Sequence, residues 1–157
     1  PFFIEKAKEG VIPITNKNMT RFNILLDEAI EMVKWAVQNA LGGEIFIPKL
    51  HSYNIMDLAE AVAPNCKKVI TGIRPGEKIH EKMINEFDSQ SSIILGDYFA
   101  ILPPDGELEK LYKKINISFT KVEDGFSYSS DNNNNFLNVD EIRKLIKENL
   151  DSKFVPI

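Results

Sequence analysis

The sequence predicts an α/β fold with enough chain for one domain. Short runs of β-branched residues alternate with segments whose apolar residues recur at helical spacing, and glycine or proline separates them. The strongest helical segment, Ile24–Ala40, is followed directly by a short apolar strand, Ile45–Ile47. A chain of 157 residues is long enough to build a real core, since domains of this size bury about 68–70% of their unfolded surface. We therefore expect a single compact unit.

The first third of the chain predicts a short helix, an edge strand and the long helix. Phe2–Glu9 is helical up to the stop at Gly10, and Val11–Thr15 is a β-type segment whose proline favours an edge position. In the long helix, the apolar positions repeat every three or four residues, and Gly42–Gly43 ends it. These positions are Leu26, Ala29, Ile30, Val33, Val37 and Ala40.

The remainder of the chain continues this alternation. A helix at Ile55–Val62 is closed by Pro64, and Ile93–Leu95 pairs with Tyr98–Ile101 through a turn at Gly96 and Asp97. A further helix is predicted at Glu107–Lys114. The last helix begins at the N-cap Asn138, with Glu141 three residues later, and has one apolar face formed by Ile142, Leu145 and Ile146.

The segment Gly72–Glu81 is the most informative one for function. It follows a strand at Lys68–Thr71. Because Gly76 permits unusual dihedrals and Pro75 suits the first helical position, the sequence predicts that the segment turns into a helix running from Glu77 to about Ile84. The free amides of a helix start favour anions, and Arg74 adds donors that suit phosphate oxygens. Glu77 is a good acceptor for paired sugar hydroxyls. This pattern favours a site for a ribose and its phosphate, and the alternative is a capped surface turn.

Arg21 stands shortly before the long helix, so we expect it near a second helix start that faces an anion. A diphosphate needs two centres of positive charge, and Arg21 with Arg74 would supply them. His80 lies one turn after Glu77 in the predicted helix, and we expect it to be structural.

Composition and residue spacing exclude several other classes of partner and of metal site. The formal net charge of −4 gives no electrostatic footprint for nucleic acid and disfavours anionic membranes. Cys66 is the single cysteine and predicts a structural thiol in a reducing compartment. Zinc and calcium motifs are incomplete, because Ile84 and Phe136 occupy positions that need a ligand and a glycine. We expect a soluble chain with no metal site.

Motifs for a reaction centre are missing as well. The sequence contains no Gly-x-Gly-x-x-Gly fingerprint, no P-loop and no Tyr-x-x-x-Lys pair. The chain therefore offers binding groups without catalytic residues of its own.

Several motifs in order resemble the carboxyl-terminal half of the UDP-N-acetylglucosamine 4,6-dehydratases, in the polysaccharide-biosynthesis branch of the extended short-chain dehydrogenase/reductase superfamily. The motifs are Pro1–Phe3, Pro13–Thr15, Met19–Phe22, Gly43–Lys49, Gly72–Glu81 and Tyr128–Asp131. His80 and the last motif favour the soluble, 5-inverting type.

The resemblance implies the end of a Rossmann-type fold with a small substrate-binding subdomain, in which residues 24–40 and 44–48 complete a Rossmann sheet. An amino-terminal Rossmann half, absent from this chain, would bind NADP and supply the catalytic residues. Arg21 and Arg74 are similar to the arginines that clasp the UDP diphosphate, and Glu77 to the acid that takes the ribose hydroxyls. Pro13, Ile14 and Thr15 would flank the uracil. The resemblance further implies a cytoplasmic homo-oligomer that binds a UDP-sugar.

Two alternatives stay open. One is half of a nucleotide-sugar 4-epimerase, which would hold the nucleotide in the same way. The other is a non-catalytic binding or assembly module that pairs with a separate cofactor-binding chain.

Overall fold

The computed structural model describes residues 2–157, so Pro1, the first residue of the first resemblance motif, lies outside the described part. The chain divides into two compact units instead of the single one expected from its length. Unit 1 combines the described chain up to Asn23 with His51–Glu81 and Ser130–Ile157, and unit 2 combines Ile24–Leu50 with Lys82–Ser129.

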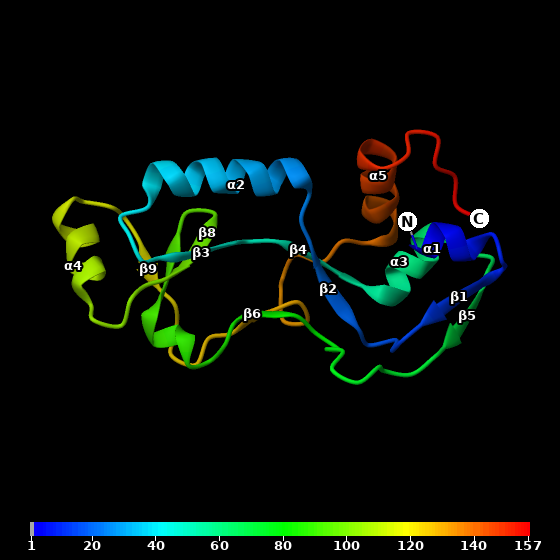
Figure 1. Cartoon of the computed structure of the whole chain (residues 1–157), viewed down its shortest axis with the longest axis horizontal. Coiled ribbons are helices and arrows are strands. Elements are labelled where there is room, and N and C mark those ends of the chain that lie inside the picture. The colour runs from blue at the N-terminus through cyan, green and yellow to red at the C-terminus, as the bar shows by residue number, and fades with distance from the viewer. Residues whose placement is uncertain (1) are drawn as a thin grey trace. The chain divides into compact units, whose positions relative to one another are not determined.

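Unit 1 contains two small sheets and three helices (Figure 1). A parallel pair joins β1 to β5, and an antiparallel pair joins β2 to β4. The elements are α1 (Phe2–Ala7), β1 (Val11–Ile14), β2 (Thr20–Asn23), β4 (His51–Asn54), α3 (Ile55–Val62), β5 (Lys67–Ile70) and α5 (Val139–Asn149). The alternation of β1 places Ile12 and Ile14 in the core, beside Ala59 and Val62 of α3.

Helix caps fix both longer helices of unit 1. The Asn54 side chain accepts a hydrogen bond from the Met56 amide at 2.7 Å, and Asn138 forms the predicted capping box with Glu141. The apolar face of α5 is buried as expected, because Ile142 packs with Ala61 of α3.

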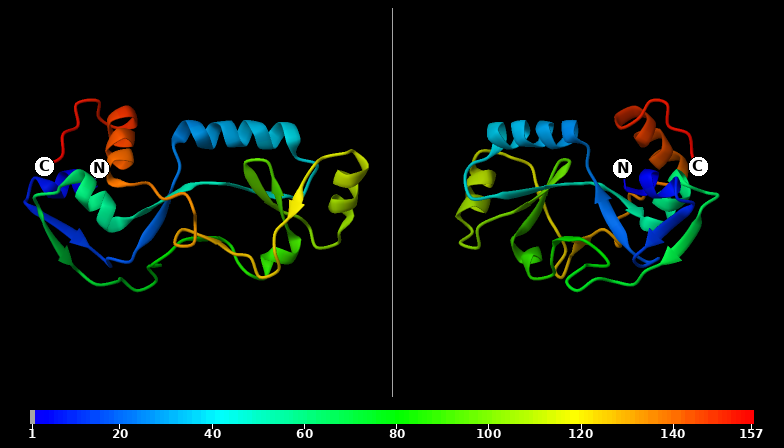
Figure 2. Two further views of the ribbon diagram at one scale, coloured as in Figure 1. Left: turned by 180° about the vertical axis from the view of Figure 1, so that it is seen from behind. Right: turned by 45° about the vertical axis from the view of Figure 1, so that its right-hand side comes forward.

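Unit 2 is built on a four-stranded antiparallel sheet in the order β3-β8-β7-β9 (Figure 2). A second, two-stranded sheet pairs β6 with β10. The elements are α2 (Leu26–Asn39), β3 (Ile45–Pro48), β6 (Lys82–Ile84), the 3₁₀-helix η1 (Asp88–Ser91), β7 (Ser92–Leu95), β8 (Tyr98–Ile101), α4 (Glu107–Lys114), β9 (Thr120–Lys121) and β10 (Tyr128–Ser129). The core gathers Ile93, Ala100 and Leu102 of the sheet region with Leu108 and Tyr112 of α4.

One predicted helix is wrong. Residues 77–84 form no helix, and their end is the strand β6. The other helices are confirmed within a few residues, as are the predicted strands. The short strands β2, β4, β6, β9 and β10 are additional, since they are too brief or too polar to show a period of two.

Candidate functional site

The two predicted substrate-binding segments start at the same edge of the parallel pair in unit 1. In β1 and β5, Pro13 is in register with Val69 and Ile14 with Ile70. One residue further on, the Thr71 amide donates to the Ile14 carbonyl at 2.8 Å. In open α/β sheets, ligands bind outside the carboxyl ends of parallel strands. Thr15 and the segment from Gly72 onward leave the sheet at this edge.

The segment Gly72–Glu81 is a tight turn followed by extended chain. The Glu77 amide donates to the Arg74 carbonyl at 3.0 Å, and Gly76 has a φ of 81°. Pro75 and Gly76 thus occupy the two central positions, as in a type II turn, and a positive φ at Gly76 is incompatible with the first turn of a helix. The predicted anion site at a helix start is therefore wrong, and any anion here meets side chains and turn amides instead.

Arg74 and Glu77 lie at the two ends of this turn. Glu77 Oε2 accepts a hydrogen bond from the Arg74 amide at 3.1 Å, so the carboxylate holds the turn closed while retaining further acceptor capacity. The Arg74 side chain is exposed and makes no hydrogen bond or ion pair with any residue in the range 2–157. Its guanidinium is available to a ligand.

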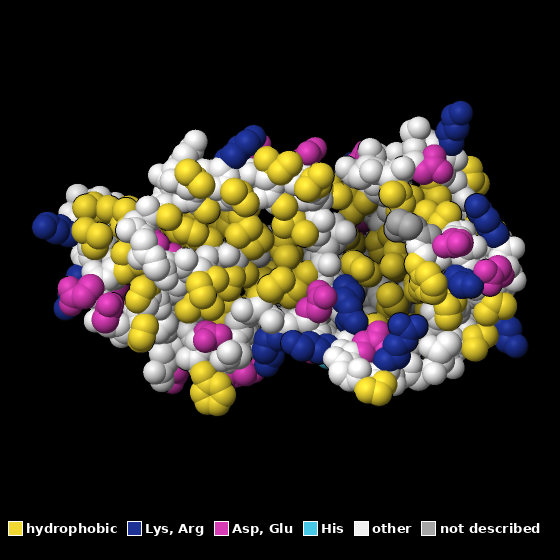
Figure 3. Space-filling view, viewed as in Figure 1, with side chains coloured by type: hydrophobic (Ala, Val, Ile, Leu, Met, Phe, Trp, Pro, Cys, Tyr) yellow, Lys and Arg dark blue, Asp and Glu magenta, His cyan; other side chains and the backbone are white. Residues whose placement is uncertain are grey.

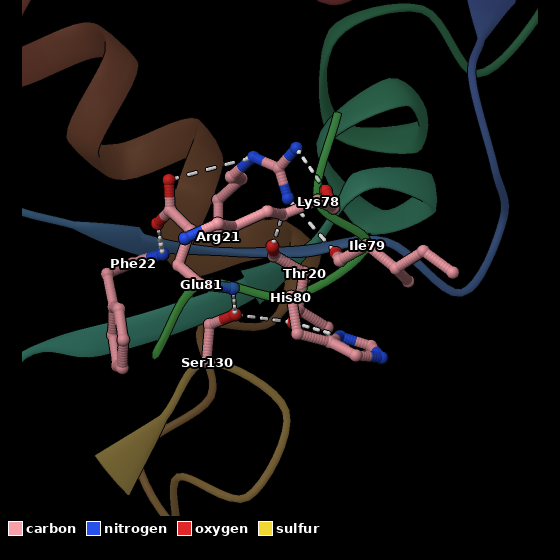
Figure 4. Close-up of polar contacts among 8 residues, drawn as sticks. All are labelled: Thr20, Arg21, Phe22, Lys78, Ile79, His80, Glu81 and Ser130. Atoms are coloured by element: carbon pink, nitrogen blue, oxygen red, sulfur yellow. Dashed lines mark hydrogen bonds and ion pairs between the residues drawn. The ribbon is translucent and has the colours of Figure 1, made fainter. Parts of the chain in front are cut away.

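Arg21 is placed differently from the expectation. It lies within β2, five residues before α2, and not at a helix start. Its Nη1 donates to the carbonyls of Thr20 at 2.7 Å and Ile79 at 3.0 Å, and its Nη2 donates to that of Lys78 at 3.0 Å (Figure 4). Through these hydrogen bonds, Lys78 and Ile79, which follow the Arg74–Glu77 turn, are attached to β2. Arg21 and the turn are therefore brought into one region of unit 1.

Glu81 also contacts Arg21 and the strand that carries it. Its Oε1 lies 3.8 Å from Arg21 Nε, and its Oε2 accepts the Phe22 amide at 3.0 Å. Three of the five N–H groups of Arg21 are used by carbonyls, which leaves one Nη2 hydrogen for a ligand besides the Nε–H that faces Glu81. The arginine is thus held rigidly, with part of its charge balanced.

A small polar cluster beneath this arginine was missed by the sequence analysis. Ser130 Oγ lies 2.7 Å from Thr20 Oγ1 and accepts the Glu81 amide at 2.9 Å, while the Ser130 amide donates to the Glu81 carbonyl at 2.8 Å (Figure 4). Thr20 and Ser130 are buried, and His80 Nδ1 lies 2.8 Å from Thr20 Oγ1. The members of this cluster are distant along the chain. Thr20, Glu81 and Ser130 each lie in a motif that carries the resemblance, but the motifs do not show which side chains meet.

An aromatic hydroxyl borders the same region. Tyr53 of β4 is in register with Arg21 of β2. Burial raises the pKa of the Tyr53 phenol, the negative charge of Glu81 raises it further, and Arg21 partly opposes this. Tyr53 is therefore a neutral phenol at physiological pH.

Taken together, these groups suit an anion attached to a diol. Arg74 is an unpaired cation, Arg21 is a preorganised one, and Glu77 is an acceptor for hydroxyls. Among the described residues, no group of three or more His, Cys, Asp and Glu side chains is placed to hold a metal ion. No helix between residues 2 and 157 has the length and apolar character needed to cross a membrane.

Comparison with known proteins identifies related chains. The family described as polysaccharide biosynthesis protein matches residues 1–103. A Campylobacter jejuni protein named UDP-N-acetylglucosamine 4,6-dehydratase (inverting) is 42% identical over 152 residues, which are 93% of this chain and 46% of that protein. A Rickettsia canadensis protein named UDP-glucose 4-epimerase is 30% identical over 151 residues, which are 93% of this chain and 44% of that protein.

A solved structure shares the fold. The X-ray structure of Pen from Bacillus thuringiensis matches with a TM-score of 0.77 and 30% identity, over 94% of this chain and 44% of that one. The resemblance and the α/β fold expected from the sequence are thereby confirmed. The chain spans less than half the length of these relatives.

Proposed function

Since the chain belongs to the polysaccharide biosynthesis protein family, we propose that it is the UDP-sugar-binding part of a UDP-N-acetylglucosamine 4,6-dehydratase, of the inverting type. The observation that carries this proposal is the bonding of Arg21 to Lys78 and Ile79, directly after the Arg74–Glu77 turn. It gathers two cations and a carboxylate in one region of one unit, as a nucleoside diphosphate requires.

In the proposed binding mode, Arg74 and Arg21 contact the diphosphate. Arg74 binds through the N–H groups of its guanidinium, none of which is used within the chain's described part. Arg21 binds through its remaining Nη2 hydrogen and its positive charge. Glu77 accepts the ribose hydroxyls through the oxygen that the turn does not use. Pro13, Ile14 and Thr15, at the carboxyl end of β1, flank the uracil.

NADP binding is proposed for the rest of the complete enzyme and not for this chain. Dinucleotide sites place the pyrophosphate at the start of a helix that directly follows a parallel strand. Here β1 leads through a turn into β2, and β5 leads through the Arg74–Glu77 turn into β6, so neither parallel strand is followed directly by a helix. The residues of this chain do not fit the cofactor. The amino-terminal Rossmann half that binds NADP, the cytoplasmic location and the homo-oligomeric assembly stay predictions.

The reaction is tested by incubating the complete protein with UDP-N-acetylglucosamine and analysing the products by mass spectrometry and NMR. A dehydratase forms a 4-keto-6-deoxy sugar nucleotide that is lighter by one water. A product of unchanged mass with the opposite configuration at carbon 4 would contradict the dehydratase.

The second candidate function is a nucleotide-sugar 4-epimerase. It is favoured by the relatives named UDP-glucose 4-epimerase, which match nearly the same region at 30% identity. The same incubation separates the two reactions, because only elimination changes the mass.

A non-catalytic assembly module is the remaining alternative. It predicts that the chain stays monodisperse in gel filtration without any partner. An incomplete half would instead aggregate, because it exposes apolar surface that its partner covers.

A further inference from the structure

Two loops of unit 1 run between the same pair of anchor points. At one end, the Thr71 amide donates to the Ile14 carbonyl at 2.8 Å, and at the other end the Thr20 amide donates to the Ile79 carbonyl at 3.1 Å. Because both ends are shared, the loops lie side by side, at the edge where β1 and β5 end (Figures 1 and 2). We call them the paired loops; they are residues 15–19, between β1 and β2, and residues 72–78, after β5.

Each of the paired loops carries a lysine that the site described above does not use. Lys17 is exposed in the middle of the first loop. Lys78 directly follows the Arg74–Glu77 turn in the second loop, where its backbone carbonyl accepts a hydrogen bond from Arg21 Nη2 at 3.0 Å and its side chain is exposed. Neither ammonium group makes a hydrogen bond or ion pair with a residue in the range 2–157. Both are therefore available to a ligand that lies over the loops.

The two arginines of the same region are accompanied by carboxylates. Glu81 Oε1 lies 3.8 Å from Arg21 Nε, and the Glu77 carboxylate accepts the Arg74 amide at 3.1 Å, so a negative charge stands beside each arginine. Figure 3 shows basic and acidic side chains close together over the chain that follows β5. Each phosphate of a sugar nucleotide carries a negative charge, which both carboxylates repel. The arginines and carboxylates together contribute no net charge, so any net positive charge on the paired loops comes from the two lysines.

We propose that Lys17 and Lys78 are further binding residues for the diphosphate, and that they supply the net positive charge which attracts it to the paired loops. This inference rests on the proposed function. A lysine ammonium is a point charge on a flexible stem, so these residues act through their charge, whereas the planar guanidinium of Arg74 fixes the orientation of the phosphates. Charges on exposed side chains are screened by salt, so their contribution to binding falls as the ionic strength rises.

The test is isothermal titration of the complete protein with UDP at two ionic strengths. At about 0.01 M salt, Lys17→Met and Lys78→Met should each weaken UDP binding about threefold to fivefold, the upper part of the range for an exposed ion pair. At about 1 M salt, where the screening length is about 3 Å, both losses should disappear. Lys17→Arg keeps the charge and should bind as the wild type does. Lys8→Met, in the turn at the opposite end of β1, is the matched control and should have no effect.

Two results would overturn the role of the lysines alone. If Lys17→Met and Lys78→Met bound UDP with wild-type affinity at low salt while Arg74→Ala bound it weakly, the lysines would be ordinary solvated side chains. If their losses persisted in high salt, or if Lys17→Arg bound as weakly as Lys17→Met, the residues would act through local structure and not through charge. A wild-type protein that binds no UDP would instead overturn the proposed function together with this inference, so the two failures are distinguishable.

Discussion

The two arginines of the candidate site differ in how the protein holds them. Arg21 is tied into unit 1 by three carbonyl groups and the carboxylate of Glu81, and its side chain is only 21% exposed. Arg74 is exposed at the end of a turn, and its side chain makes no hydrogen bond or ion pair with residues 2–157. The same residue type therefore serves two purposes. In the proposed site, Arg21 holds the surrounding chain together and also contributes to binding, whereas Arg74 serves the ligand alone.

The largest expected effect on stability is that of Arg21→Ala. The substitution removes three charged hydrogen bonds and should lower the free energy of unfolding by about 3 kcal/mol, since each such bond is worth about 1.5–3 kcal/mol and water replaces part of them. Urea unfolding measures this. Arg21→Lys keeps the charge without the planar fork and should recover only part of the loss. Wild-type stability of Arg21→Ala would contradict the structural role.

The second largest effect on stability is expected for Ser130→Ala. The change leaves the Glu81 amide and the buried Thr20 hydroxyl each without one partner, which should cost about 2 kcal/mol of unfolding free energy. Ser152→Ala, at an exposed position near the end of the chain, is the control and should be neutral. Equal stability of the two variants would show that the hydrogen bonds of Ser130 do not stabilise the fold.

A smaller effect is expected for Gly76→Ala. A Cβ at this position meets no atom within 4 Å, so the cost comes only from the positive φ and should be about 1 kcal/mol. Gly76→Asn should cost less, because asparagine adopts this conformation more readily. Thermal unfolding measures both variants. If alanine were tolerated fully, residues 74–77 would not form the turn described above.

The sequence predicted most of the regular elements, and the reasons are local. Caps, such as Asn138 with Glu141, and helical periodicity act within a few residues, so α2, α3, α4 and α5 were all foreseen. The predicted helix at residues 77–84 failed because Pro75–Gly76 was interpreted as the entry to a helix. A proline followed by a glycine with positive φ closes a turn instead.

The residues of the candidate site were selected from the sequence, but the contacts between them were not predicted, and their role in binding stays a prediction. Arg21, Arg74 and Glu77 stood out by their chemistry, and Arg21 and the Arg74–Glu77 turn lie in one region. The hydrogen bond of Arg21 to the Lys78 carbonyl joins residues far apart in the chain. Every residue has a backbone carbonyl, so a sequence does not show which one will accept a hydrogen bond. Ser130 lies in the motif Tyr128–Asp131, but its contacts with Thr20 and Glu81 could not be identified in advance, because those residues are far from it along the chain. The periodicity of α2 was correct, but it could not reveal that the apolar face of this helix is largely exposed.

The smallest expected effect on stability belongs to Arg74→Ala, which should change the unfolding free energy by less than about 0.5 kcal/mol, as for other surface positions. This variant is therefore suited to a binding experiment, since the fold is unaffected. Lys8→Ala, an exposed cation in the turn at the opposite end of β1, is its matched control.

Isothermal titration of the complete protein with UDP tests the central claim most directly. Removal of the Arg74 guanidinium should weaken UDP binding by about 1.5–3 kcal/mol, the usual value for hydrogen bonds to charged groups, while Lys8→Ala binds as the wild type does. An unchanged affinity of Arg74→Ala for UDP would contradict the assignment of this arginine to the diphosphate, and with it the proposed nucleotide-sugar site.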